Sequence, residues 1–158
     1  MPCLTDFWRQ RRRRPRKWLN DVAVRLGYRR PMQAYLIVFL GAGLGGCLRH
    51  TINLLAARLW GTNFPWGTFV INISGSLVMG LIAGWLAFRA GAGWTQHVRL
   101  FLLTGILGGY TTFSAFSLDA ALLYERGEPG LMAAYVVGSV LLALAGVFGG
   151  LALVRALS

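Results

Sequence analysis

Acidic residues, histidines and cysteines are scarce in this sequence. Its 158 residues include five Asp or Glu, two His and two Cys. Cys3 and Cys47 lie far apart, so no disulfide framework is indicated. His50, His97 and the scattered acids lack the spacing of metal ligands, and no pairing of Ser or Cys with His suggests a catalytic nucleophile. The scarcity argues against an enzyme and against a metal centre built from side chains.

Positive charge is plentiful only at the N-terminus. Ten of the sixteen Lys and Arg residues lie in the first 30 positions, so the net charge of +11 describes the tail, residues 1–32, rather than the body. A transit peptide would be rich in Ser, whereas the first Ser is Ser74. We expect the tail to be disordered or to lie on a lipid surface, without binding nucleic acid, unless translation starts near Met32 and omits it.

Long apolar runs fill the body of the chain, residues 33–158. Hydrophobic residues make up 56% of the sequence, and four stretches reach or exceed the roughly 20 residues that cross a bilayer core. Short connectors with charges, Gly and Pro separate these stretches, and Trp and Tyr fall near their ends. We therefore predict an all-α integral membrane protein with four transmembrane helices, at residues 33–60, 67–88, 98–124 and 130–154.

Glycines recur four residues apart in every stretch. This spacing lets the backbones of membrane helices approach closely, which predicts tight helix pairs. Four thin helices enclose little interior, so we also expect an oligomer. The pairs are Gly41 and Gly45, Gly80 and Gly84, Gly105 and Gly109, and Gly146 and Gly150.

The third stretch is too long for a straight span. Its residues 98–124 would extend about 40 Å as one helix, against roughly 30 Å of hydrocarbon. Gly108 and Gly109 precede the β-branched Thr111 and Thr112, a combination that weakens a helix. We predict a break near the middle of this helix, where freed backbone carbonyls can hold a cation.

Neutral hydrogen-bond donors gather within the apolar stretches. Thr68, Asn72 and Ser76 share one face of the second helix, and Tyr135 and Ser139 share one face of the fourth. A hydroxyl usually bonds to the preceding turn of its own helix, whereas no intrahelical carbonyl fully satisfies the two amide hydrogens of an Asn. Asn72 is therefore expected to have a functional or interhelical role.

Phe113 and Phe116 lie three residues apart, close to Thr112 and Ser117. Such a pair is more often core than site, but the edge of an aromatic ring is electropositive and can stabilise an anion weakly. Hydroxyls, an amide and ring edges together suit a small, strongly hydrated anion, because conduction needs binding that replaces water without retaining the ion.

Two charges fall within the predicted spans, and each needs a partner or water there. Arg49 either draws anions into a vestibule or makes a structural ion pair, and the sequence favours neither reading. Asp119 lies toward the end of the third stretch. A small proton-coupled multidrug exporter, the nearest alternative function, needs a carboxylate near the centre of a span, and residues 33–60 contain none. A purely structural membrane protein would not explain the stacked donors.

Three segments resemble the signature motifs of the CrcB/Fluc family of fluoride channels, in order and with the right spacing. They are "GAGLGGCLRH" at 41–50, "GTFVINISGSLVMG" at 67–80 and "GILGGYTTFSAFS" at 105–117. The resemblance implies a passive channel in the bacterial inner membrane that exports cytoplasmic fluoride and protects against its toxicity. It further implies an antiparallel homodimer with two pores at the interface between subunits and a central sodium ion.

Roles follow from the resemblance by matching motif positions. The backbone carbonyls of Gly108 and Thr111 from both subunits would hold the sodium ion. The fluoride pores would be lined or supported by Asn72, Phe113, Phe116, Thr112, Ser114, Tyr135, Ser139, Thr68 and Arg49. Two departures remove hydroxyls that relatives carry, at Ala115 and Ala143.

An antiparallel homodimer requires one chain to insert in both orientations, which needs a balanced charge on the two sides. If the N-terminus lies inside the cell, three arginines of the body lie near the inner side of the membrane and two near the outer side. The tail adds ten basic residues to the inner side. We therefore expect either a chain starting near Met32 or a paralogue of opposite orientation as the second subunit. The arginines counted are Arg89, Arg99 and Arg155 against Arg58 and Arg126.

Overall fold

A computed structural model describes residues 31–87 and 95–157, all of the helices below among them. The chain divides into units Met1–Leu36 and Ile37–Ser158, and the contacts described below all lie within the second unit. Four helices in the described residues are long and apolar enough to cross a membrane: Met32–Trp60, Trp66–Ala87, Gln96–Glu125 and Pro129–Ala156. The prediction of an all-helical protein with four such helices is confirmed. The boundary that we expected between residues 32 and 33 is not tested, because residues 1–30 of the tail lie outside the described part of the chain.

The first, second and fourth spans are single helices. α3 covers Pro31–Trp60, α4 covers Trp66–Ala87 and α8 covers Pro129–Ala156. Gly61 follows the last residue of α3, with a φ of 77° that favours glycine and an N–H that donates to the Ala57 carbonyl. α8 begins at Pro129, where the missing N–H of proline costs no helical hydrogen bond.

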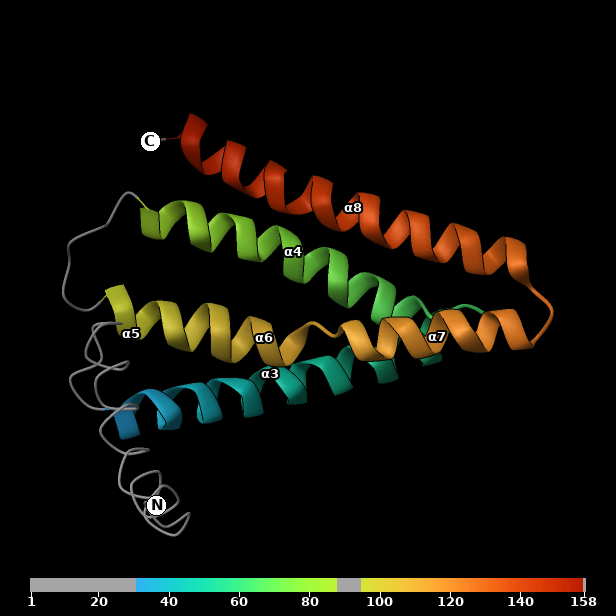
Figure 1. Ribbon diagram of the computed structural model, residues 1–158, viewed down its shortest axis with the longest axis horizontal. Coiled ribbons are helices and arrows are strands. Elements are labelled where there is room, and N and C mark those ends of the chain that lie inside the picture. Colours follow the sequence, from blue (N-terminus) through green and yellow to red (C-terminus); the bar gives the residue numbers. More distant parts are fainter. Residues whose placement is uncertain (1–30, 88–94, 158) are drawn as a thin grey trace, which may run out of the picture. The chain divides into compact units, whose positions relative to one another are not determined.

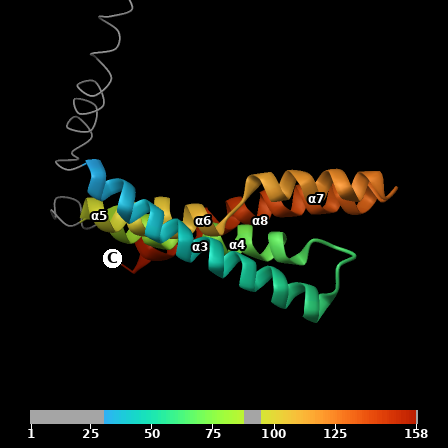
Figure 2. The same ribbon diagram turned by 90° about the horizontal axis from the view of Figure 1, so that it is seen from below.

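The third span is built from four successive pieces. They are α5 (Thr95–Arg99), the π-helix η1 (Leu100–Leu107), α6 (Gly108–Tyr110) and α7 (Phe113–Glu125). Thr111 and Thr112 between α6 and α7 have extended dihedrals, with ψ of 158° and 119°. Figure 2 shows the non-helical link between α6 and α7. The π-helical turn pattern over residues 100–107 was not predicted.

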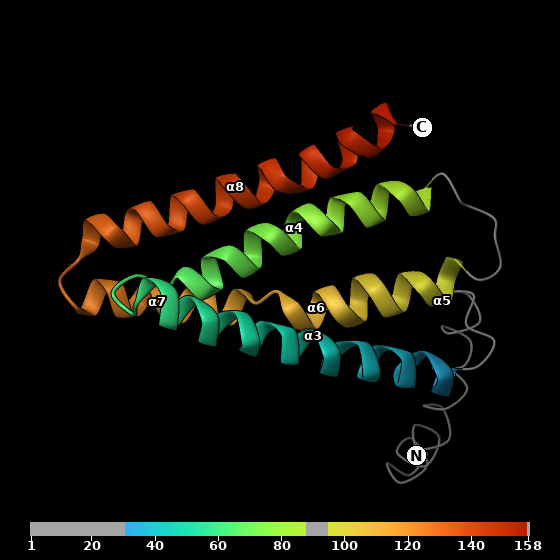
Figure 3. The same ribbon diagram turned by 180° about the vertical axis from the view of Figure 1, so that it is seen from behind.

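Glycine lets two pairs of helices approach closely. Figures 1 and 3 show α4 alongside α8, and α3 alongside η1 and α6. A Cβ atom on Gly150 would lie 2.6 Å from the Leu77 carbonyl oxygen on α4, and one on Gly41 would lie 2.8 Å from the Gly105 Cα. The predicted role of the glycine pairs in helix packing is confirmed.

Few side chains are buried within the described part of the chain. Ile71, Leu123 and Tyr135 are the largest that are fully buried, whereas α3 exposes many apolar side chains, Phe39 at 74% among them. Such surface requires lipid or another protein chain to cover it. The burial pattern is that of a membrane protein whose helices pack mainly along glycine contacts.

Candidate functional site

Asn72 of α4 forms two hydrogen bonds with the backbone of Thr112. Its Nδ2 donates to the Thr112 carbonyl at 3.1 Å, and its Oδ1 accepts from the Thr112 N–H at 2.9 Å. The orientation of the amide follows from these partners, because the flipped amide would place N–H against N–H and oxygen against oxygen. Of the functional or interhelical role that we expected for Asn72, these bonds support the second, and its role in a pore stays a prediction. The amide replaces the helical bonding that the extended backbone lacks.

Thr112 also starts α7. Its side chain is buried, and its Oγ1 accepts a 3.2 Å hydrogen bond from the Ala115 N–H, the standard role of an N-cap threonine. The Ser114 hydroxyl lies 3.2 Å from the same oxygen. Ser114 is exposed in the single chain, so its hydroxyl borders the cap rather than a closed interior.

These bonds free two carbonyls. In a continuous α-helix the Gly108 carbonyl would accept from the Thr112 N–H, and the Thr111 carbonyl from the Ala115 N–H. Both donors are committed elsewhere, to Asn72 Oδ1 and to Thr112 Oγ1. The Thr111 side chain and N–H both donate to the Leu107 carbonyl and so do not serve Gly108. Gly108 and Thr111 therefore offer oxygen ligands of the kind that a hard cation prefers.

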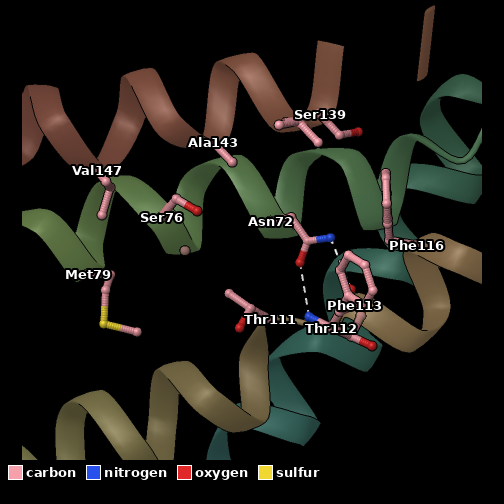
Figure 4. Close-up of a pocket in the computed structure, with 12 residues that line it drawn as sticks. Asn72, Ser76, Met79, Thr111, Thr112, Phe113, Phe116, Ser139, Ala143 and Val147 are labelled. Atoms are coloured by element: carbon pink, nitrogen blue, oxygen red, sulfur yellow. Dashed lines mark hydrogen bonds between the residues drawn. The ribbon is translucent and has the colours of Figure 1, made fainter. Parts of the chain in front are cut away.

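A cavity of about 290 Å³ lies beside this break (Figure 4). α4, the break, α7 and α8 all contribute to its wall, and no charged side chain occurs in the described lining. Ser139 of α8 is 4% exposed, and its Oγ is a buried oxygen without a hydrogen-bond partner among the described residues. The lining residues are Asn72, Gly75, Ser76, Met79, Thr111, Thr112, Phe113, Phe116, Ser139, Val140, Ala143 and Val147.

The two phenylalanines of the third motif face this cavity together. Their ring centroids lie 5.5 Å apart with the planes inclined at 37°. Phe113 is 78% exposed in the single chain, whereas Phe116 is partly buried and lies 5.2 Å from the ring of Tyr135. An exposed phenylalanine beside an uncharged cavity is free to turn its edge toward an ion or to pack against another chain.

Thr68 lines a second cavity, of about 310 Å³, whose wall also includes Asp119 and Arg126. Tyr135 is fully buried, and its hydroxyl donates to the Asp119 carboxylate at 3.4 Å. Thr68 is also buried. Tyr135 belongs to neither described lining, but it contacts Phe116 of the first cavity and Asp119 of the second.

Arg49 is the predicted pore residue on α3, whereas the others lie on α4, α7, α8 or the link before α7. It is half-buried on α3 and lines neither cavity. No ion pair joins it to an acid within residues 31–87 and 95–157, so a structural pairing inside the described chain finds no support.

Sequence reasoning missed part of the cavity wall. Met79 and Val147 were given no role, and Ser76 was noted only as part of the polar stripe. Asn72, Ser76 and Met79 are spaced i, i+4 and i+7, so extending the stripe by one turn would have found Met79. Ala143, noted for its missing hydroxyl, lines the same cavity.

Comparisons with known proteins place the chain in a family. Residues 36–151 match the family described as CrcB-like protein, Camphor Resistance (CrcB). A "Fluoride-specific ion channel FluC" of Rhodopseudomonas palustris (strain BisB5) is 69% identical over 124 residues, which cover 78% of this chain and 98% of the relative. "Fluoride-specific ion channel FluC 2" of Nitrobacter hamburgensis is 66% identical over the same shares of the two chains.

A third relative, from Beijerinckia indica subsp. indica, bears the name "Fluoride-specific ion channel FluC" and is 57% identical over 127 residues. The match covers 80% of this chain and all of the relative. The family match spans well over half of the chain, and full-length relatives align at high identity. The chain therefore belongs to the CrcB/FluC family of proteins.

Proposed function

We propose that this chain is a passive, fluoride-selective ion channel, a transporter rather than an enzyme, that carries fluoride out of the cytoplasm. The chain is a multi-pass protein of the bacterial inner membrane. The observation that carries the proposal is the neutral cavity beside the helix break. It presents an amide, hydroxyls and phenylalanine rings without a charged side chain in its described lining.

Neutral donors suit fluoride because the ion is small and strongly hydrated. A fixed Lys or Arg at the narrowest point would bind the anion tightly and slow its release, whereas several weaker donors replace water and still let it leave. Asn72 keeps one amide hydrogen beyond the one given to Thr112, and Ser139 has an unpaired buried hydroxyl. Both line the cavity and would contact the ion.

The pores are completed by a second subunit in this proposal. Phe113 is largely exposed although it lines the cavity, and α3 exposes an apolar surface that needs a cover. An antiparallel homodimer, or a dimer with an oppositely oriented paralogue, would enclose two such cavities at the interface. Arg49, half-buried on α3, would stand at the entrance to a vestibule and raise the local concentration of anions.

A sodium ion would hold the centre of the dimer. The carbonyls of Gly108 and Thr111 fit this role, because the N–H groups that would bond to them in a helix are committed elsewhere. Carbonyls from both subunits would supply oxygen ligands and no net charge. The ion then has a structural role, because it holds the two breaks together and is not itself transported.

Fluoride leaves the cell down its electrical gradient. It enters as the neutral acid, dissociates in the more alkaline cytoplasm and is trapped there as the anion. A negative-inside potential is worth about 2.3 kcal/mol per charge per 100 mV, so a passive pore suffices for export. No ATP hydrolysis or proton exchange is required, and this separates the channel from the proton-coupled exporter.

The test of this mechanism uses liposomes loaded with fluoride and made permeable to potassium with valinomycin. A channel releases fluoride as fast as the potassium path permits, with no pH gradient and with a protonophore present. Release that stops when the pH gradient is collapsed, or that requires a cationic drug on the opposite side, would identify a coupled exporter instead. Empty liposomes carried through the same steps give the background leak.

A further inference from the structure

Helix α4 braces the third span on both sides of its extended link. Before the link, the Ser74 and Tyr110 hydroxyls lie 2.9 Å apart. After the link, Asn72 holds both backbone polar groups of Thr112. Between these contacts Gly75 leaves room for the Thr111 methyl group, where a Cβ atom would collide with it. The break is therefore held by side chains of another helix.

The bond from the Thr112 N–H to Asn72 has a consequence for Gly108. That N–H is the donor that a regular helix would direct to the Gly108 carbonyl. Without an acceptor on Asn72, a buried N–H would be left unpaired, and the nearest way to satisfy it is to rebuild the helical turn over residues 108–112. That rebuilt turn would occupy the Gly108 carbonyl and withdraw it from a cation.

The same amide faces the anion cavity. Nδ2 carries two hydrogens, one of which bonds to the Thr112 carbonyl, while the residue lines the cavity beside Phe113 and Ser139. Figure 4 shows the Asn72 side chain pointing from α4 toward Thr112, with Phe113 beside Thr112 and Ser139 on α8. The amide thus has three roles in one place, since it accepts from the break, donates to the break and retains one donor for the cavity.

We infer that Asn72 is a positioning residue for the cation site as well as a donor to the anion, so that both ion sites depend on one amide. The inference rests on the proposed sodium site. It adds a reason why the Gly108 carbonyl is free to bind the ion, namely that Asn72 accepts the N–H of Thr112. Sodium binding favours the extended link, and the extended link aims the Asn72 amide. Sodium therefore orders the donor that fluoride meets.

Three variants separate these roles. Asn72→Ala removes all of them. Asn72→Asp keeps an acceptor for the Thr112 N–H, and as the neutral acid its O–H donates to the Thr112 carbonyl, so no donor is left for the cavity. Ser76→Ala, one turn along the same face of α4, alters the same cavity without touching Thr112, because no hydrogen bond from Ser76 to the break is found in the described chain.

The first readout is hydrogen exchange of the Thr112 amide, followed in full-length protein labelled with ¹⁵N-threonine. Asn72→Ala should speed exchange by about tenfold or more, because the amide loses its acceptor. Asn72→Asp and Ser76→Ala should leave exchange close to that of the unaltered protein. Unchanged protection in Asn72→Ala would overturn the inference that Asn72 holds the break.

The second readout is the rise in melting temperature when sodium replaces a large organic cation. The unaltered protein, Asn72→Asp and Ser76→Ala should show the rise, and show it more for sodium than for potassium or lithium, whereas Asn72→Ala should lose it. If sodium raises the melting temperature of Asn72→Ala as much as that of the unaltered protein, Asn72 does not position the cation site. The inferred coupling of the two ion sites would then be wrong.

Fluoride flux is measured on the same samples. Asn72→Asp should lose fluoride flux and still show the rise in melting temperature with sodium. A purely structural role of Asn72 does not produce this pattern. A protein that conducts fluoride but shows no sodium rise in any form would refute the cation site and the coupling, and leave the channel standing. A protein that shows the rise without any fluoride flux would refute the channel and leave the positioning role standing.

Discussion

The hydroxyls of Ser74 and Tyr110 lie 2.9 Å apart and join α4 to α6 just before the backbone becomes extended. Ser74 Oγ also lies 2.7 Å from the Val70 carbonyl, to which its hydroxyl donates. Tyr110 can then donate to Ser74, so that both hydroxyls are satisfied within apolar surroundings. The pair anchors the N-terminal side of the break as Asn72 anchors the other.

Tyr110→Phe should therefore destabilise the protein modestly. It removes one hydroxyl and leaves Ser74 bonded within its own helix, so we expect a loss of about 0.5–1.5 kcal/mol in the free energy of unfolding. Thermal unfolding in detergent measures this. Tyr124→Phe, at a tyrosine that is 65% exposed, is the matched control and should change little. Equal effects of the two substitutions would show that the hydroxyl pair adds no stability.

Gly150 and Gly149 provide a neighbouring pair with opposite expectations. A Cβ atom on Gly150 would lie 2.6 Å from the Leu77 carbonyl oxygen, whereas one on Gly149 meets no atom within 4 Å. Gly150→Ala should force α4 and α8 apart at a cost of about 1–3 kcal/mol. Gly149→Ala should leave the melting temperature unchanged or raise it, because alanine favours a helix over glycine. Equal losses at both positions would contradict the glycine-mediated packing.

The phenylalanine edges should matter for conduction more than for folding. Phe113→Ile and Phe116→Ile keep an apolar side chain but remove the electropositive ring edge, so each should reduce fluoride flux at least about tenfold. Phe148→Ile on α8, at an exposed phenylalanine outside the described cavity lining, should conduct normally. Flux is followed with a fluoride electrode on liposomes that contain equal amounts of each protein. Normal flux in both motif variants would assign these rings to packing.

Ser139 should affect conduction and stability differently. Its buried Oγ has no partner in the described structure, so Ser139→Ala gives up no protein hydrogen bond and should leave the melting temperature unchanged or slightly higher. Fluoride flux should fall, because the cavity loses a donor. Ala143→Ser, which places a hydroxyl one turn further along the same wall, should keep or raise flux. A large loss of stability in Ser139→Ala would show that the hydroxyl has a structural partner.

The four long helices could be predicted because each apolar stretch is bounded by Gly, Pro or charge. The second stretch, expected at 67–88, is helix Trp66–Ala87, and the fourth, expected at 130–154, is Pro129–Ala156. A hydrogen-bond partner outside its own helix was also predictable for Asn72, and the structure shows this partner to be the backbone of Thr112. Its spare amide hydrogens require a partner outside its own helix.

Features that depend on tertiary contacts were not predictable. The sequence of η1 (Leu100–Leu107) is apolar except for Thr104 and carries no sign of a π-helix. Its neighbour across the helix contact is the distant Gly41. The identity of Thr112 as the partner of Asn72 likewise depends on how α4 meets the break. The role of Gly108 and Thr111 in holding sodium stays a prediction, as do the dimer and the pore roles of the lining residues.

The most direct test of the account compares fluoride with chloride in liposomes that contain the purified full-length chain. Both anions are loaded at equal concentration, potassium is allowed to follow, and ion-specific electrodes record each release. A cavity of neutral donors that strips water from a small anion should pass fluoride rapidly and chloride at the rate of empty liposomes. Comparable release of the two anions, or release of neither, would contradict the assignment of a fluoride-selective channel.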